Sequence, residues 1–98
     1  MKATDPKFQE VVDKVIELHN KKGEDYGTDE DPHANLRAAT TLGISPWVGA
    51  TLRMADKERR IAKFVKGDEL ANESVYDSIL DNAVYGLIRL MLYVEENG

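Results

Sequence analysis

Residues 73–94 read ESVYDSILDNAVYGLIRLMLYV, and this stretch decides the fold that the sequence predicts. It contains no proline, and at about 100° per residue its apolar residues fill one broad arc, as expected of a long packed helix. Three carboxylates, Glu73, Asp77 and Asp81, fall inside this arc at a spacing of four residues. Ionised carboxylates are costly in apolar surroundings, and this spacing makes their charges repel, so we expect a cation beside them. The polar face is expected to carry Ser78, Asn82 and Arg89.

Composition narrows the class of protein. Ninety-eight residues suit one domain with a modest core, which oligomerisation would complete. The net charge of -5 argues against nonspecific nucleic-acid binding. The absence of cysteine excludes disulfides, thiol nucleophiles and cysteine-zinc sites. No apolar run is long enough to span a membrane and no signal-peptide core is present, so we expect a cytoplasmic protein without a membrane partner.

Three proline pairs mark the starts of further helices. Asp5-Pro6, Asp31-Pro32 and Ser45-Pro46 each place a capping residue before proline, and Gly23, Gly43 and Gly67 follow as stop signals. These signals predict helices over residues 6–22, 32–42 and 46–66, followed by the helix over 73–94, which Asn72 would cap. The predicted fold is all-α: residues 1–98 form a single helical bundle of three long helices and one short helix, completed by oligomerisation.

The short connection at residues 67–72 makes the last two long helices antiparallel neighbours. Folding this hairpin at residues 69–70 brings Glu58, on the apolar face of its helix, to the level of Asp81. Glu58, Asp77 and Asp81 would then converge as hard oxygen ligands, which suit Mg²⁺ or Mn²⁺ and, through the metal, phosphate oxygens. Nearby cations would hold the phosphates of a phosphoanhydride while metal-bound water attacks it; these cations are Lys22, Arg53, Lys57 and Arg60.

The two histidines make zinc an unexpected metal. His19 and His33 do not have helical ligand spacing with each other, and no other imidazole or thiol is available. His19 lies in the apolar stripe of the first helix, where it is either a hydrogen-bonded core histidine or a ligand-binding residue. No P-loop, GxGxxG motif or Ser-His-Asp arrangement of useful spacing occurs.

Four segments carry a family resemblance: HNKKGEDYG at 19–27, PHANLR at 32–37, RMADKERRI at 53–61 and ESVYDSILDNAVYGL at 73–87. In this order they resemble the all-α nucleoside triphosphate pyrophosphatase superfamily, which includes MazG-like proteins and dimeric dUTPases. The likeness is greatest to small phage-type helical domains associated with nucleotide modification. The first acidic motif of MazG-like proteins is reduced here to Asp56-Lys57-Glu58, and the second has a spacing of four residues instead of three.

The resemblance implies a homodimer or homotetramer that uses Mg²⁺ to hydrolyse a nucleotide to the monophosphate and pyrophosphate. On matching positions, Glu58, Asp77 and Asp81 would bind the metal and Glu73 would assist catalysis. The residues implied in substrate binding are His19, Lys22, Asp25, Tyr26, Asn35, Arg53 and Lys57. The alternative is a non-catalytic helical oligomerisation module whose acidic line is neutralised by Arg53, Lys57 or Arg60 of a neighbouring subunit.

Overall fold

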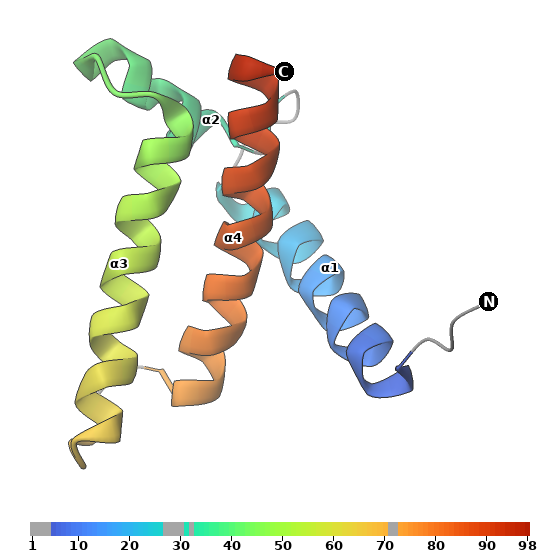
Figure 1. Cartoon of the computed structure of the whole chain (residues 1–98), viewed down its shortest axis with the longest axis vertical. Coiled ribbons are helices and arrows are strands. Elements are labelled where there is room, and N and C mark those ends of the chain that lie inside the picture. The colour runs from blue at the N-terminus through green and yellow to red at the C-terminus, as the bar shows by residue number, and fades with distance from the viewer. Residues whose placement is uncertain (1–4, 27–30, 32, 71–72) are drawn as a thin grey trace.

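The computed structural model describes residues 5–26, 31, 33–70 and 73–98, and within these ranges the chain is helical without strands. Figure 1 shows the order of elements: α1 (Pro6–Tyr26), α2 (Ala34–Arg37), the 3-10 helix η1 (Ala38–Leu42), α3 (Pro46–Val65) and α4 (Val75–Asn97). The predicted all-α class, with three long helices and one short helical segment, is therefore confirmed. None of the described helices is long and apolar enough to cross a membrane.

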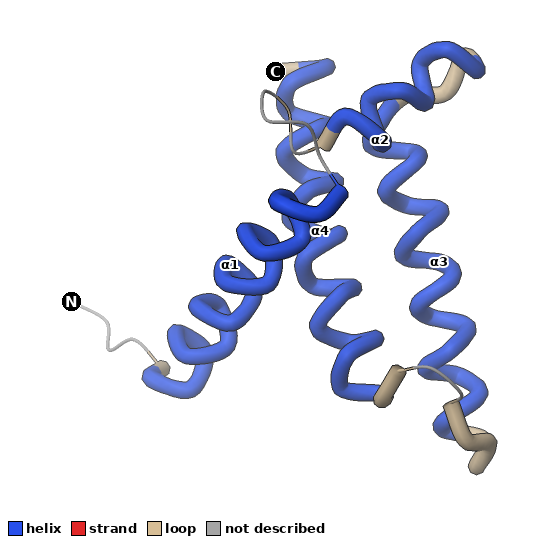
Figure 2. Tube along the Cα trace, turned by 180° about the vertical axis from the view of Figure 1, so that it is seen from behind, coloured by secondary structure: helices blue, strands red, loops and turns tan. Residues whose placement is uncertain are grey.

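Helices α3 and α4 form the antiparallel hairpin that the short connection predicts, and they pack side by side along their lengths (Figure 1). Helix α1 meets α4 near its own C-terminal end and diverges from it toward its N-terminus, as the view from behind also shows (Figure 2). The buried apolar cluster is small and consists of Val15, Val84, Ile88 and Leu92. Around it pack Leu18, Leu36, Trp47, Leu80 and Tyr85.

Glycine ends two of the helices as predicted but does not end the first. Gly43 after η1 and Gly67 after α3 adopt positive φ angles of 75° and 98°, which favour glycine over residues that carry a Cβ. Gly23, by contrast, lies inside α1, which continues to Tyr26. The predicted end of this helix at Lys22 is therefore wrong, because a glycine in a right-handed conformation weakens a helix by only about 1 kcal/mol and does not terminate it.

The start of α4 also differs from the prediction. Ser74 caps the helix: its side chain accepts a hydrogen bond from the Asp77 backbone N–H, while the Asp77 carboxylate accepts one from the Ser74 backbone N–H. The predicted cap, Asn72, lies outside the described residues. Glu73 therefore precedes the helix and does not stack above Asp77, as a continuous helical line would require.

The buried face of α4 is rotated from the predicted one. Ser78, expected on the polar face, is fully buried, and Asp77, expected in the apolar arc, is exposed. Several apolar residues of the predicted arc are exposed as well, among them Ile79, Leu87 and Leu90. The helix is apolar around most of its circumference, so the apolar arc alone did not determine which part α3 and α1 cover.

Candidate functional site

A partly buried ion-pair network connects α1, α3, α4 and Glu73, which precedes α4. Lys57 Nζ lies 2.9 Å from Asp81 Oδ2 and 3.0 Å from Glu73 Oε1, and Lys22 Nζ lies 2.9 Å from Asp81 Oδ1. The hydroxyl of Ser78 donates a hydrogen bond to Glu73 Oε2. Two lysines thus neutralise two carboxylates. The expectation that a cation lies beside the acidic residues is confirmed for Glu73 and Asp81, whose lysines come from the same chain, but not for Asp77, which caps α4.

Lys57 occupies the position that the sequence analysis gave to Glu58. The face of α3 that meets α4 contains Met54, Lys57 and Ile61, all partly buried, whereas Glu58 is exposed and accepts a hydrogen bond of 2.6 Å from Asn82 Nδ2. The predicted level of Glu58, beside residue 81, is therefore nearly right, but its predicted direction is wrong. Residues 57 and 58 flank the Met54–Ile61 line on opposite sides in projection, so the apolar pattern favoured neither.

The network shifts the proton affinities of its members. Burial raises the pKa of Asp81, but hydrogen bonds from Lys22 and Lys57 lower it by more, so its pKa lies below the ordinary value. The Ser78 hydroxyl, and after it Lys57, lower the pKa of Glu73. Burial opposes the charge of Lys57, yet its bonds to Asp81 and Glu73 raise its pKa. The charges of Asp81, Glu73 and Lys57 therefore persist at neutral pH.

The three residues implied as metal ligands are not brought together as one oxygen cluster. Asp77 closes the cap of α4, Glu58 bonds to Asn82, and each oxygen of Asp81 is held by a lysine. Among the described residues, no group of three His, Cys, Asp or Glu side chains is placed to hold a metal ion. Asp56, whose role the sequence left open, pairs with Arg59 at 3.0 Å and with Arg60 at 3.6 Å.

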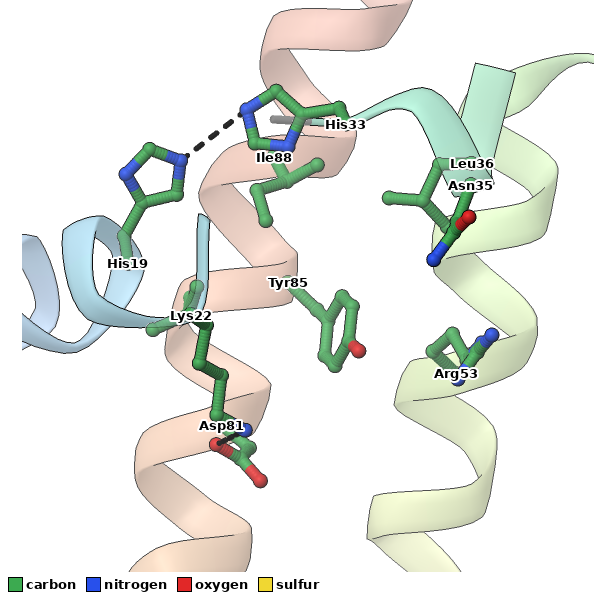
Figure 3. Close-up of a pocket in the computed structure, with 10 residues that line it drawn as sticks. His19, Lys22, His33, Asn35, Leu36, Arg53, Asp81, Tyr85 and Ile88 are labelled. Atoms are coloured by element: carbon green, nitrogen blue, oxygen red, sulfur yellow. Dashed lines mark hydrogen bonds and ion pairs between the residues drawn. The ribbon is translucent and has the colours of Figure 1, made fainter. Parts of the chain in front are cut away.

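A pocket of about 400 Å³ opens beside this network, and Figure 3 shows the side chains around it. Its polar lining comes from α1, α2 and its N-cap, α3 and α4: His19, Lys22, His33, Asn35, Arg53, Asp81 and Tyr85. Four of the seven residues implied in substrate binding, His19, Lys22, Asn35 and Arg53, are thus brought together. Lys57 is not among the residues that line the pocket, but it pairs with Asp81, which is. The side chains of Asp25 and Tyr26 lie outside the described part of the chain.

Two polar residues of the pocket, Tyr85 and His33, were not predicted from the sequence as site residues. Tyr85 lies one helical turn after Asp81 on α4 and projects toward α3 (Figure 3), so the spacing of four residues could have identified it. His33 caps α2, and its Nε2 lies 3.2 Å from the Nε2 of His19. No sequence signal could have identified this contact, because residues 20–32 between the two histidines fix no spacing between them.

Contacts with the end of α4 hold both α2 and the start of α3. Arg37 forms ion pairs of 2.7 Å with Asp31 and 2.9 Å with Glu95, and the indole N–H of Trp47 donates to Glu96 at 3.0 Å. Trp47 also contacts Tyr93 edge to face. These contacts position His33 and Asn35, which would otherwise depend on a helix of four residues.

Comparison of this chain with protein-family models, with curated proteins and with solved structures finds no match. The family resemblance therefore stays a prediction that depends on the four sequence segments.

Proposed function

We propose that this protein binds a nucleotide, and that the pocket between α1, α2, α3 and α4 holds its phosphate groups. The family resemblance assigns substrate binding to residues from separate parts of the sequence. The supporting observation is that four of these residues line a single pocket. A volume of about 400 Å³ lies within the range of about 300–1,000 Å³ that small-molecule sites occupy.

The cations of the pocket suit an anionic ligand. With the residues that the structure describes, Arg53 forms no ion pair, so its guanidinium remains available for a bidentate contact with phosphate. Lys22 is fixed by Asp81 while its side chain stays 38% exposed, so its other N–H groups can donate to a ligand. Tyr85 supplies a ring beside these cations for contact with a sugar or base.

Hydrolysis of the nucleotide is the further expectation from the resemblance. It requires Mg²⁺ or Mn²⁺, and the described carboxylates do not fit such an ion as they are placed, because Asp81 is bonded to two lysines and Asp77 to a helix cap. We therefore propose binding as the function that the geometry supports best, and the Mg²⁺-dependent pyrophosphohydrolase activity remains a prediction to be tested on the bound nucleotide.

A thermal-shift panel of nucleoside mono-, di- and triphosphates, with Mg²⁺ and with EDTA, tests the proposal. One nucleotide should raise the melting temperature, and Arg53→Ala should weaken its affinity about tenfold, equivalent to about 1.4 kcal/mol. The matched control is Arg59→Ala, an exposed arginine on the same helix that pairs with Asp56; its affinity should be unchanged. A flat panel, or equal loss in both variants, contradicts the proposal.

The second candidate is an oligomerisation module, and the exposed surface favours it. The chain exposes 7308 Å², about 1,700 Å² more than the roughly 5,600 Å² expected of a compact monomer of this mass. Its radius of gyration is 15.1 Å, against about 12.6 Å for a compact domain of this length. Large apolar residues are exposed on the two diverging helices: Phe8, Val11 and Ile16 on α1, and Ile79, Leu87 and Leu90 on α4.

We propose that a second copy of the chain covers this face, giving a homodimer or homotetramer. A standard interface buries about 800 Å² per partner, so the excess surface is sufficient. Light scattering on the purified chain measures the oligomer directly. An oligomer combined with a flat nucleotide panel would favour the module over the nucleotide-binding protein, whereas a stable monomer would contradict self-association.

A further inference from the structure

We infer that His19 and His33 form a binding site for a divalent transition-metal ion such as Zn²⁺, coordinated by the Nε2 atom of each imidazole. This site is separate from the carboxylates considered above and does not depend on nucleotide binding. It also reverses the sequence-based expectation that zinc has no site here, because that expectation relied on spacing along the chain and not on the folded geometry.

The distance between the two nitrogen atoms fits two ligands of one ion. The two Nε2 atoms are 3.2 Å apart, and the ring centroids are 5.0 Å apart with an angle of 31° between the planes. Zinc binds imidazole at about 2.0–2.1 Å, so two histidines on one tetrahedral ion place their nitrogens about 3.3 Å apart. The separation of the two nitrogen atoms therefore already matches that of two ligands of one ion.

The other ring nitrogen of His19 supports the same assignment. Nδ1 of His19 lies 3.3 Å from Oδ1 of Asn20. An amide oxygen only accepts hydrogen bonds, so a proton on Nδ1 would satisfy this contact and leave the lone pair of Nε2 for a metal ion. Histidine ligands of metals commonly donate their second N–H to an oxygen in this way, which fixes the tautomer that binds.

With this tautomer of His19, Nε2 of His33 would donate to Nε2 of His19 in the metal-free protein. Binding of the ion requires neutral His33 to move its proton from Nε2 to Nδ1, a change of tautomer that leaves the charge of the protein unchanged. Burial, together with the nearby His19 and Arg37, lowers the pKa of His33, which keeps it neutral at pH 7. The other charged groups near the pair are Lys22, Asp31 and Glu95.

Two histidines are too few ligands for a structural zinc site, which has four protein ligands. Both also line the pocket of about 400 Å³, from which water or an oxygen ligand could complete the coordination. Nitrogen ligands favour Zn²⁺, Ni²⁺ or Co²⁺ over Mg²⁺, which prefers oxygen. Because His19 is on α1 and His33 precedes α2, a bound ion would also link α1 to the start of α2.

Calorimetric titration of the full chain, without a polyhistidine tag, with Zn²⁺ alone tests this inference. His19 and His33 are the only histidines in the sequence, so their contribution can be isolated. We expect saturable binding of one ion per chain that weakens about tenfold or more in His19→Ala and in His33→Ala. Glu17→Ala is the matched control, because it removes a surface charge from the same helix and should leave the affinity unchanged.

Imidazole ¹⁵N NMR of the unmutated protein tests whether both histidines coordinate the ion, even if a histidine variant fails to fold. Zinc should shift the Nε2 resonances of both histidines, whereas Mg²⁺ should shift neither. Binding should also weaken below about pH 6.5, where protons compete for the imidazoles. Absence of saturable binding, coordination through one histidine only, or equal affinity in the double alanine variant would overturn the inference.

Discussion

Replacement of Lys57 by methionine is the sharpest test of the ion-pair network. Methionine preserves the length and most of the apolar volume of the lysine side chain, so packing between α3 and α4 is retained while the charge is lost. The substitution leaves Glu73 without its cation and leaves Asp81 with Lys22 alone. Two carboxylates would then remain charged at the interface with only one lysine to neutralise them.

The expected loss follows from the burial of the partners. Hydrogen bonds to charged groups contribute about 1.5–3 kcal/mol each, and removal of one member of a fully buried pair costs about 3–5 kcal/mol. The side chains of Lys57, Glu73 and Asp81 are 16%, 20% and 9% exposed, so water screens part of the charge. We therefore expect Lys57→Met to lower the free energy of unfolding by about 2–3 kcal/mol at pH 7.

The pH dependence of this loss has a defined sign. In the unmutated protein the pKa values of Asp81 and Glu73 are lowered, so their stabilising contribution is present above the ordinary carboxyl pKa and is lost as pH falls through the lowered values. In Lys57→Met that contribution is reduced at every pH. The difference between the two proteins should therefore be greatest near pH 7 and should shrink as pH falls below the ordinary carboxyl pKa values of 3.8 for Asp81 and 4.5 for Glu73.

Urea denaturation at pH 7 and at about pH 3, below the ordinary carboxyl pKa values, measures both effects. Lys63→Met provides the matched control, because Lys63 is an exposed lysine on the same helix, and its effect should stay within about 0.5 kcal/mol. Equal stability of the two variants at pH 7 would refute the reasoning, and so would a loss in Lys57→Met that does not depend on pH. The first result would mean that the carboxylates reach water, and the second that packing, not charge, was lost.

Three further outcomes are expected. Ser74→Ala removes the capping hydrogen bond to the Asp77 backbone and should cost about 1 kcal/mol in urea denaturation, whereas Ser45→Ala should cost less, because the Ser45 side chain makes no capping bond to α3. The pKa of His33 is lowered, so the unfolded chain binds that proton more tightly and stability should fall as pH drops below about 6.5; His33→Gln should flatten this dependence. Leu87→Glu places a charge on the exposed apolar face of α4 and should lower the oligomer mass measured by light scattering, while an unchanged mass would exclude this face from the interface.

The sequence predicted the elements of the fold because their signals are local. Proline pairs and glycines fixed most helix ends, and a short connection fixed the antiparallel pairing of α3 and α4. The exception at Gly23 has the same origin, since a stop signal is a preference that neighbouring residues can outweigh. The divergence of α1 from α4 had no local signal, because it depends on contacts between residues far apart in the chain.

The sequence predicted several of the residues that line the candidate site, but not the directions in which the side chains of α3 and α4 point. Four residues implied in substrate binding do line one pocket, and the expected pairing of the acidic residues with cations is confirmed for two of the three. The choice between Lys57 and Glu58 was wrong because both residues lie close to the same apolar line, and a shift of one residue exchanges a cation for an anion at the interface. The contact between His19 and His33 depends on how the chain between them folds, which no periodic pattern describes.

The arrangement of Asp81 bears on whether this acidic residue binds a metal or positions a cation. A divalent ion would have to displace Lys22 and Lys57 from the same two oxygens. If that exchange costs the 2–3 kcal/mol expected for Lys57 alone, the affinity for the ion falls by about 30- to 150-fold. Mg²⁺ is bound through few protein oxygens and retains much of its water, so such a loss would leave little binding. Under the proposed function, Asp81 therefore holds Lys22 at the pocket wall, where its ammonium group can meet a phosphate.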